Sequence, residues 1–456
     1  MMNRVKQAVV LAAVVVGVSS AYAGTAEYVP GEVIVKYKDG LIRSRESMNT
    51  LYDDARITSV RRLKGSLNGF EQLRFNAEDT QMDDVVQTFM KNDAVEYVQP
   101  NYILRSLPVA EENVAVSPAA GIPCFFPGFP PGCEDSETPV TRPVLNPAPA
   151  DVVPPVADPS LSEAYGLSKI GATSAWKANR GSKKIIVAVI DTGVDYNHED
   201  LSFNVWRNPK PTQNDVVGFD FVHNDGLPFD DNKHGTHTSG TVGAVGGNGK
   251  GVSGVSQRVS VMAIKFLSGQ GSGTTADAIR AVDYAINHGA KVLSNSWGGH
   301  GNDNNQALFQ AIERAKAKNV LFVAAAGNDG TDNDGSDPAY PAGFTNDNLI
   351  AVAATDRNDQ MASFSNYGKK TTHLGAPGVG VYSTTPGGQY EALSGTSMAC
   401  PHVAGAAALI WSKKPTLTYK QVKNILMSTA DPVSSLAGRT VTGARLNVLK
   451  ALAAVK

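Results

Sequence analysis

A chain of 456 residues with a formal net charge of −2 has no large excess of either sign. This balance argues against a nucleic-acid or anionic-membrane partner, because both favour a basic surface. With 42% hydrophobic and 18% charged residues, the composition is that of an ordinary globular protein, long enough for more than one domain.

The N-terminus predicts a secretory signal peptide over residues 1–23. Arg4 and Lys6 form its positive start, residues 8–18 its apolar core, and an Ala-x-Ala cleavage site ends at Ala23. The core is too short to span a bilayer comfortably, which disfavours the alternative of a membrane anchor. We therefore expect a secreted protein, extracellular or periplasmic, with no membrane segment in its mature form.

Residues 28–105 predict a compact α/β unit. Residues 31–37 alternate like a strand, residues 80–91 have helical apolar spacing, and residues 94–102 read as a second strand. The stretch 106–159 differs, because it is dense in Pro, Ala and Val and shows little periodicity. It predicts a semi-extended linker.

The chain has three cysteines. Cys124 and Cys133 lie close together in the linker, where they could form a small disulfide loop or stay a free pair. Cys400 is expected to be a small buried hydrophobic residue.

From residue 160 to the C-terminus the pattern alternates between short apolar strands and helices. The predicted strands are 185–190, 259–267, 291–296, 320–326 and 349–354, and the predicted helices include 275–287 and 306–318. This alternation predicts an α/β domain with a doubly wound, mainly parallel sheet covered on both faces. Sites in such sheets form at the carboxyl ends of strands, and Asp191 and Asn328 both follow strand runs.

A candidate nucleophile, Ser397, lies in the run Gly-Thr-Ser-Met-Ala-Cys-Pro-His, on a glycine-led turn before the apolar helix 403–411. The positive end of that helix would face the chemistry. Free serine is a poor nucleophile and needs a base and an orienting carboxylate. Asp191 and His234 supply both types of group, although each of the three could singly be a turn, helix-start or capping residue.

The segments around these residues, in the order Asp, His, Ser, resemble the subtilisin-like serine proteases (subtilases). The resemblance covers about residue 165 to the C-terminus. It implies a serine endopeptidase in which Ser397 attacks, His234 is the general base and Asp191 orients the imidazole. A fourth motif, Ala-Ala-Ala-Gly-Asn, ends at Asn328 and implies a side-chain donor to the oxyanion beside the Ser397 N–H.

The unit 28–105 opens with Pro-Gly-Glu-Val-Ile-Val and closes with Val-Glu-Tyr-Val-Gln-Pro-Asn-Tyr, which resembles the inhibitor-type propeptide of subtilases. This implies a ferredoxin-like α+β domain that assists folding and then blocks the protease as an intramolecular inhibitor. We expect a self-processing zymogen, cleaved near residues 102–107, and a monomer that acts on polypeptides.

The resemblance also implies the substrate-binding surface, where exposed backbone pairs with an extended peptide. Its residues are Gly271, Ser296, Trp297, Gly298, Ala325 and Gly327. Walls of Ala and Gly predict broad specificity with an apolar preference at the residue before the cleaved bond (P1), while Asp329 could also tolerate Lys or Arg. Trp297 either lines the site or packs in the core beneath it.

Structural calcium is the expected cofactor, with no organic cofactor. Asp200, Asn248 and Asp356 match family ligand positions, and Asp225, Asp230 and Asp231 could form a further site, although each aspartate could also be a surface charge. His237 is expected to be a buried helix residue, because no Glu-containing zinc motif accompanies it. Lys233 is expected to point to solvent.

Two other functions stay open. A catalytically silent subtilase could serve as a binding module, but all four motif residues are present. An ester hydrolase of another α/β type would need a Gly-x-Ser-x-Gly turn, which the proposed nucleophile lacks.

Overall fold

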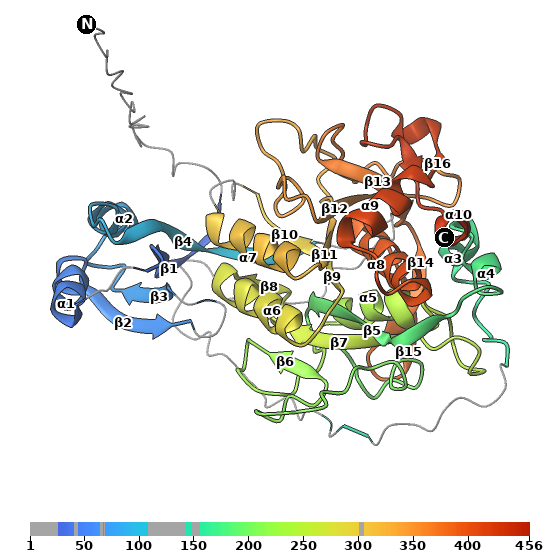
Figure 1. Ribbon diagram of the computed structural model, residues 1–456, viewed down its shortest axis with the longest axis horizontal. Helices are drawn as coiled ribbons and strands as arrows, with labels where there is room; N and C mark the ends of the chain where they lie inside the picture. The colour runs from blue at the N-terminus through green and yellow to red at the C-terminus, as the bar shows by residue number, and fades with distance from the viewer. Residues whose placement is uncertain are drawn as a thin grey trace, which may run out of the picture.

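The computed structural model describes residues 26–40, 44–63, 67, 69–107, 143, 145–146, 156–300 and 305–456. Within these residues the chain forms a small N-terminal domain and a larger C-terminal domain, at the left and right of Figure 1. The predicted signal peptide and the pair Cys124 and Cys133 lie outside the described residues, so both stay predictions.

The small domain has six elements in the order βαββαβ. They are β1 (Tyr28–Tyr37), α1 (Arg45–Asp54), β2 (Ile57–Arg62), β3 (Phe70–Phe75), α2 (Met82–Met90) and β4 (Val95–Ser106). The strands pair antiparallel in the order β4-β1-β3-β2. Strand residues such as Val33, Val35 and Leu73 share one core with Leu51 of α1 and Phe89 of α2. This is the predicted ferredoxin-like arrangement.

The large domain is built on a nine-stranded sheet in the order β16-β17-β13-β12-β11-β9-β5-β7-β6. All neighbours are parallel except β16 and β17. The strands are β5 (Gly181–Asp191), β6 (Gly218–Asp220), β7 (Arg258–Lys265), β9 (Val292–Asn295), β11 (Leu321–Ala325), β12 (Leu349–Thr355), β13 (Thr372–Pro377), β16 (Asp431–Pro432) and β17 (Ala444–Arg445). The predicted α/β class and mainly parallel sheet are confirmed.

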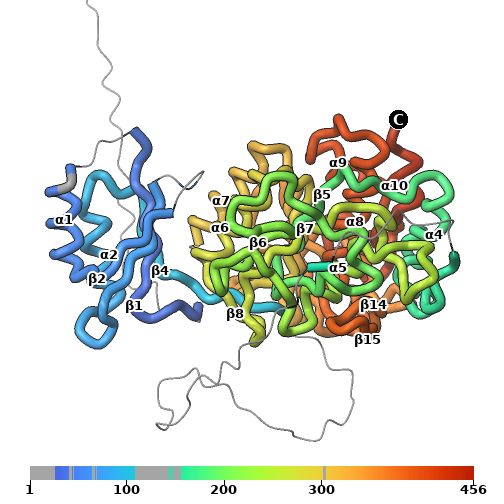
Figure 2. The backbone as a smooth tube through the Cα atoms, turned by 90° about the horizontal axis from the view of Figure 1, so that it is seen from below, coloured from blue at the N-terminus to red at the C-terminus, as the bar shows by residue number. Residues whose placement is uncertain are grey.

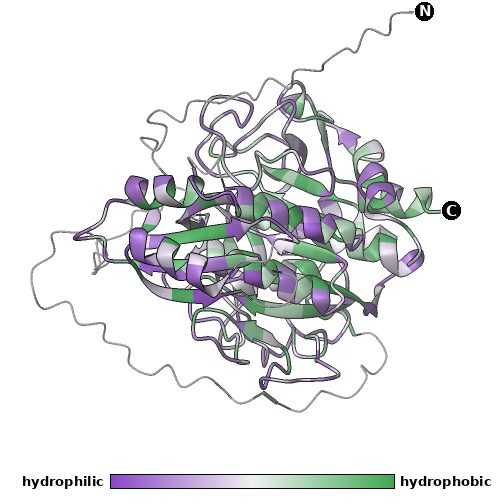
Figure 3. Cartoon of the chain, turned by 60° about the vertical axis from the view of Figure 1, so that its left-hand side comes forward, coloured by the Kyte–Doolittle hydropathy of each residue, from purple (hydrophilic) through white to green (hydrophobic). Residues whose placement is uncertain are grey.

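Helices cover both faces of this sheet. The helices α5 (His234–Gly243) and α8 (Thr396–Lys413) pack on one face, and α6 (Thr275–Asn287) and α7 (Gln306–Ala317) on the other. Alternate residues of β5 divide between the two cores, because successive strand side chains point to opposite faces. Figure 3 shows the hydrophobic strands between helices with hydrophilic outer sides.

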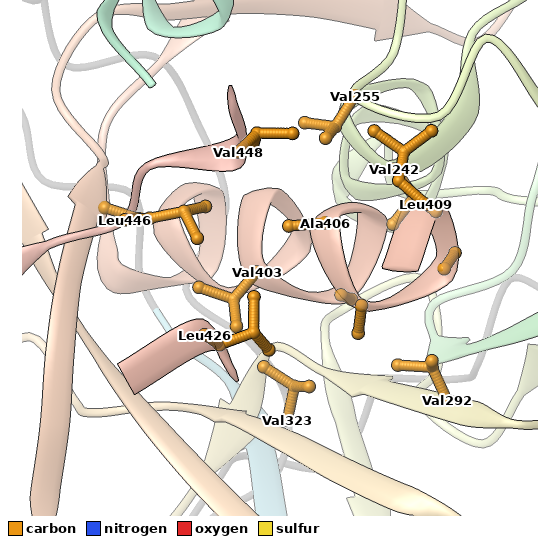
Figure 4. Close-up of a cluster of buried hydrophobic side chains, with 14 of the residues drawn as sticks. Val242, Val255, Val292, Val323, Val403, Ala406, Leu409, Leu426, Leu446 and Val448 are labelled. Atoms are coloured by element: carbon orange, nitrogen blue, oxygen red, sulfur yellow. The ribbon is translucent and has the colours of Figure 1, made fainter. Parts of the chain in front are cut away.

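The central helix α8 is buried along nearly its whole length. Figure 4 shows it between Val292 and Val323 of the sheet on one side and Val242 and Val255 on the other. It begins at Thr396, seven residues before the predicted start, because small residues and Pro401 hide the helical pattern of its first turns. None of the described helices combines the length and apolarity that crossing a bilayer requires.

The remaining described elements lie outside the nine-stranded sheet and its four covering helices. They are α3 (Tyr165–Lys169), α4 (Ala172–Ala175), α9 (Tyr419–Ser428), α10 (Val448–Ala454), the 3-10 turn η2 (Ser434–Leu436), the hairpin β14 (Val381–Thr385) and β15 (Gln389–Leu393), and the short strands β8 (Ser272–Thr274) and β10 (Trp297–Gly298).

The end of β4 leaves the small domain and pairs with β8 and β10 of the large one. Figure 2 shows β4 reaching across to β8. Side chains of β4 also reach the starts of two helices. The side-chain oxygen of Asn101 accepts from the Ala276 N–H of α6 (3.0 Å), and that of Gln99 accepts from the Ala307 N–H of α7 (2.9 Å). The small domain thus caps the positive ends of both helices.

Candidate active site

Asp191 and His234 meet at the carboxyl end of β5. Asp191 is the last residue of β5, and His234 begins α5. The Nδ1 atom of His234 lies 2.7 Å from Oδ1 of Asp191, and both side chains are buried. Oδ1 also accepts from the Thr192 N–H at 2.7 Å, and Oδ2 accepts from Thr238 Oγ1 at 3.3 Å. The carboxylate is therefore fixed on both oxygens, and it holds the imidazole by Nδ1.

The protonation of His234 reflects two opposing effects. Burial disfavours the imidazolium, while the charge of Asp191, the hydrogen bond that His234 donates to Asp191, and the charge of Asp230 favour it. The carboxylates prevail, so the pKa of His234 lies above its ordinary value. Its Nε2 atom is buried and has no hydrogen-bond partner among the described residues. This arrangement leaves Nε2 as the atom at which the imidazole could accept a proton.

Ser397 lies in the first turn of α8, where backbone N–H groups have no acceptor within the helix. Its hydroxyl donates to the carbonyl oxygen of Ser296 at 3.2 Å, and it makes no hydrogen bond to Nε2 of His234 here. In return, Oγ of Ser296 donates to the Ser397 carbonyl at 2.9 Å. To act as the nucleophile, the Ser397 hydroxyl would have to turn from this carbonyl toward the imidazole.

Asn328 is held against the turn that carries Ser397. Its side-chain oxygen accepts from both the N–H and the hydroxyl of Thr396, each at 2.8 Å. A Cβ atom at Gly395 would stand 3.1 Å from the Asn328 Nδ2 atom and 3.6 Å from the Ser397 nitrogen. The side-chain amide and the Ser397 N–H thus border the same space, which glycine keeps open. This arrangement suits two donors to one developing oxyanion.

The end of β4 lies between β8 and β10, which we call the binding strands. Arg105 pairs antiparallel with Ser272 in β8 and with Gly298 in β10. The Ser106 N–H donates to the Gly271 carbonyl at 2.7 Å. Gly271 has φ +78°, and a Cβ there would lie 2.3 Å from Ser106 Oγ, so glycine is needed for this close approach. A strand added between two edges is how an extended peptide would bind.

The remaining predicted substrate-binding residues are Trp297, Ala325 and Gly327. The Trp297 backbone pairs with Ser106 of β4, while its side chain is fully buried and donates from Nε1 to the Ile190 carbonyl at 2.8 Å. Trp297 was expected either to line the site or to pack in the core beneath it. Its side chain packs in the core. Ala325 ends β11 in the same apolar cluster against which Leu107 packs. Gly327 has φ +114° and approaches the Asn366 side chain too closely for a Cβ atom.

Two buried carboxylates meet beside the loop 247–252. Asp200 accepts from Asn248 Nδ2 (2.8 Å) and from a backbone N–H of the loop, and Asp158 accepts from Gly247 N, Asn248 N and Ser253 Oγ. Burial, with a contribution from the Asp158 carboxylate, raises the pKa of Asp200 to about 7. Calcium uses carboxylate, amide and carbonyl oxygens as ligands, whereas Asn248 here turns its Nδ2 donor toward Asp200, so a calcium ion at this loop would have to replace these N–H contacts with oxygen ligands. The sequence patterns missed Asp158, which lies in the Pro-rich stretch.

The other candidate metal ligands are engaged elsewhere. Asp356 accepts from the backbone N–H groups of residues 358 and 360 in its own loop. Asp230 accepts from Thr236 at the start of α5, and Asp231 pairs with the buried ammonium of Lys265 at 2.7 Å. Among the residues that the structure places, no cluster of three His, Cys, Asp or Glu side chains could hold a metal.

Two residues next to the site have structural roles. His237 is buried, and its Nε2 atom lies 2.9 Å from the Val381 carbonyl; burial lowers its pKa to about 3. Lys233 does not simply extend into solvent, because its ammonium pairs with both oxygens of Glu391 at 3.0 Å. Its side chain is half exposed, and Lys233 is not among the groups that shift the pKa of His234.

A fold of this type with an Asp–His–Ser arrangement at the sheet's carboxyl edge belongs to the serine hydrolases. Comparison with protein-family models matches residues 182–449 to the Subtilase family and residues 16–101 to the Fervidolysin N-terminal prodomain. The first match covers more than half of the chain. The chain therefore belongs to the subtilase family, and it is a serine endopeptidase preceded by a propeptide domain.

Three relatives illustrate the similarity. Thermitase of Thermoactinomyces vulgaris is 41% identical over 291 residues, which cover 64% of this chain and 96% of the relative. Subtilisin DY of Bacillus licheniformis is 42% identical, covering 58% of this chain and 90% of the relative. A thermophilic serine proteinase of Bacillus sp. (strain AK1) is 32% identical, covering 89% and 84%.

Proposed function

We propose that the protein is a self-processing zymogen that cleaves peptide bonds with Ser397 as nucleophile, His234 as base and Asp191 as the group that orients His234. Ser397 Oγ bonds to the peptide carbonyl carbon as its proton passes to His234 Nε2. Asn328 Nδ2 and the Ser397 N–H receive the negative charge on the carbonyl oxygen. His234 returns the proton to the leaving nitrogen, the C–N bond breaks, and water hydrolyses the acyl-enzyme in the same way.

The observation that carries this proposal is the 2.7 Å contact of His234 Nδ1 with Asp191, which leaves Nε2 directed away from the carboxylate and without a partner in the described part of the chain. The test is Ser397→Ala in the full chain, which should accumulate uncleaved precursor. Wild-type protein should lose activity with a serine-directed phosphonylating reagent, and the label should map to Ser397. Normal self-maturation of Ser397→Ala would refute the proposal.

For specificity, we propose broad cleavage with an apolar preference at P1. Support comes from Leu107, which packs against the same apolar cluster as Ala325 and lies 3.8 Å from a Cβ position at Gly298. Asp329 at the end of the Asn328 loop is paired with His300 at 2.9 Å, which offsets the charge that would attract Lys or Arg. A peptide library with no cleavage after Phe, Tyr, Leu or Met would contradict this preference.

Calcium is proposed as a structural ion held by Asp158, Asp200 and Asn248. When bound, the ion would neutralise the carboxylate pair and fix the loop 247–252, with no part in bond cleavage. Support comes from the burial of both carboxylates and from Asn248, which contacts each of them. Calorimetry with calcium and chelated protein tests this assignment.

We further propose that the signal peptide spans residues 1–23, that residues 28–105 form the propeptide, that 106–159 link it to a peptidase domain over 160–456, and that the enzyme is an exported monomer. Export is supported by the positive start, the short apolar core and the Ala-x-Ala cleavage site of the predicted signal peptide. N-terminal sequencing of protein recovered from the medium or periplasm, and its mass by light scattering, would test both statements.

A further inference from the structure

Two of the segments predicted to enclose the P1 side chain are those around Gly298 in β10 and Gly327 after β11. An apolar side chain lies beside them in the structure: Leu107 Cδ2 stands 3.8 Å from a Cβ position at Gly298, and Leu107 packs against the apolar cluster that includes Ala325. Neither glycine has a side chain with which to select a charge. Any selection between charged and uncharged P1 residues must come from groups farther along these segments.

A third segment, around Ala339, contacts both of them. A Cβ atom at Gly327 would stand 3.1 Å from the Cβ atom of Ala339. The next residue, Tyr340, exchanges two backbone hydrogen bonds of 2.9 Å with Gly299. The three segments are therefore in direct contact, so side chains at corresponding places along them can meet.

Each of the three segments carries an ionisable side chain two residues away from its small residue. These side chains are His300, Asp329 and Asp337, which we call the charged rim. The Nε2 atom of His300 lies 2.9 Å from Asp329 Oδ2, and its Nδ1 atom lies 3.5 Å from Asp337 Oδ2. The imidazole thus stands between two carboxylates and faces each with a different nitrogen.

The protonation of His300 sets the charge of this rim. The hydrogen bond with Asp329 favours the imidazolium, burial opposes it, and the charges of Asp329 and Asp337 favour it, so the pKa of His300 lies above its ordinary value. The same hydrogen bond holds the pKa of Asp329 below its ordinary value, with a smaller contribution from Asn366. Among the residues that the structure places, these two carboxylates are the charged groups that act on His300.

We propose that His300 is a specificity-determining residue: when protonated it offsets the charge of Asp329 and restricts P1 to uncharged side chains, and when neutral it leaves Asp329 to attract Arg or Lys. This inference rests on the proposed function, because it concerns the P1 side chain of a peptide cleaved at Ser397. A neutral imidazole can still donate one N–H to Asp329, but it no longer cancels the negative charge. The accepted P1 residues therefore widen as pH rises.

The first experiment isolates the charge of the P1 side chain. Peptides that differ only in carrying arginine or citrulline, its uncharged isostere, at P1 are given to enzyme matured from the full chain. The measured quantity is the ratio of kcat/KM for arginine to that for citrulline, from about pH 6 to about pH 9. Arginine stays charged throughout, and the titration of His234 cancels in the ratio.

We expect this ratio to rise roughly fivefold with pH, as befits a partly exposed ion pair. The midpoint should lie above the ordinary imidazole pKa of about 6.5, because the pKa of His300 is raised. A ratio that is constant or falls as pH rises would overturn the inference.

Three variants assign the effect to the charged rim. His300→Gln should hold the ratio at its high-pH value throughout, since an amide carries no charge. Asp329→Asn should remove most of the rise, because the attracting carboxylate is gone. His223→Gln is the matched control and should keep the wild-type curve: the Nδ1 atom of His223 lies 2.8 Å from Asp220, outside the three segments. A ratio that still rises with pH in His300→Gln would refute the role of His300.

Salt keeps the inference testable if a variant does not fold. In the wild-type enzyme at high pH, the ratio should fall as ionic strength rises from about 0.01 M to about 1 M, because the charged rim is partly exposed and is screened. A ratio independent of salt would contradict the inference. Failure of the proposed function looks different, because Ser397→Ala would then cleave both peptides as the wild type does.

Discussion

Ser296 and Ser397 exchange two hydrogen bonds, one from each hydroxyl to the other residue's backbone carbonyl. The bond to the Ser397 carbonyl has a cause inside α8. Pro401, four residues later, has no N–H, so the carbonyl of Ser397 loses its helical partner. Ser296 supplies the missing donor. Because Pro401 removes the helical hydrogen bond to the Ser397 carbonyl, the proposed nucleophile is instead hydrogen-bonded to Ser296, which adjoins β10.

Ser296→Ala should leave that buried carbonyl without a donor and lower the free energy of unfolding by about 1–3 kcal/mol. Urea unfolding in a Ser397→Ala background avoids self-digestion. Adding Pro401→Ala should recover part of the loss, because it restores the helical N–H. Ser294→Ala is the matched control, since among the described residues the hydroxyl of Ser294 has a weak contact with the Cys400 sulfur at 3.9 Å and none with the Ser397 carbonyl. No recovery in the double variant would contradict this account.

Asn328→Ala should lower kcat by roughly 10²–10³ with little change in KM, as expected when a donor to the oxyanion is removed. Thr396→Val should act through Asn328, because it removes the hydroxyl that fixes the Asn328 side-chain oxygen. We expect a fall in kcat of roughly tenfold or less, the worth of one net hydrogen bond. Thr396→Ser keeps the hydroxyl and should stay near wild type, and full activity of Thr396→Val would contradict the positioning role.

The pH profile of kcat/KM should report His234. The base must be neutral, and its pKa is raised, so activity should fall with decreasing pH at a value above the ordinary imidazole pKa of about 6.5. Asp191→Asn should shift this acid limb to lower pH as well as reduce the rate. Lys233→Gly should leave the limb in place, because that ammonium pairs with Glu391. A limb that moves in Lys233→Gly would show that Lys233 acts on the imidazole.

Removing calcium should shorten the lifetime of the folded enzyme on heating. An ion at 100 times its Kd contributes about 2.7 kcal/mol, and loss of that contribution leaves two buried carboxylates uncompensated. Asp158→Asn and Asp200→Asn should each abolish the protection by added calcium, whereas Asp356→Asn should retain it. The measurement is the half-life of activity at a fixed temperature, with and without chelator. Identical half-lives for the wild type would contradict the proposed calcium site.

The thiol of Cys400 should be inert in the folded protein. It is fully buried, and burial raises its pKa to about 12, which keeps the reactive thiolate scarce. In a Cys124→Ser, Cys133→Ser background, a thiol reagent should label nothing until the protein is unfolded. Loss of activity on labelling the native form would disprove this burial argument.

The sheet and the residues at its edge could be predicted because they depend on strong local patterns. Strands buried on both faces are continuous apolar runs, and Asp191 ends one of them. The short strands β8 and β10 could not be predicted, since three and two residues show no period and pair only because β4 lies beside them. Asp158 was missed because its surroundings read as linker. The hydrogen bond from Ser296 to the Ser397 carbonyl was also missed. Pro401 in the sequence shows that this carbonyl lacks its helical donor, but not which residue supplies another.

If the propeptide is removed as proposed, the edges of β8 and β10 that now pair with β4 would lose their hydrogen-bond partner. Long, flat edges of this kind invite other chains to stack and aggregate. Here each edge is only two or three residues long. Edges of this length would suffice to bind a few residues of an extended polypeptide. They would be too short for a second copy of the protein to add a stable strand and aggregate.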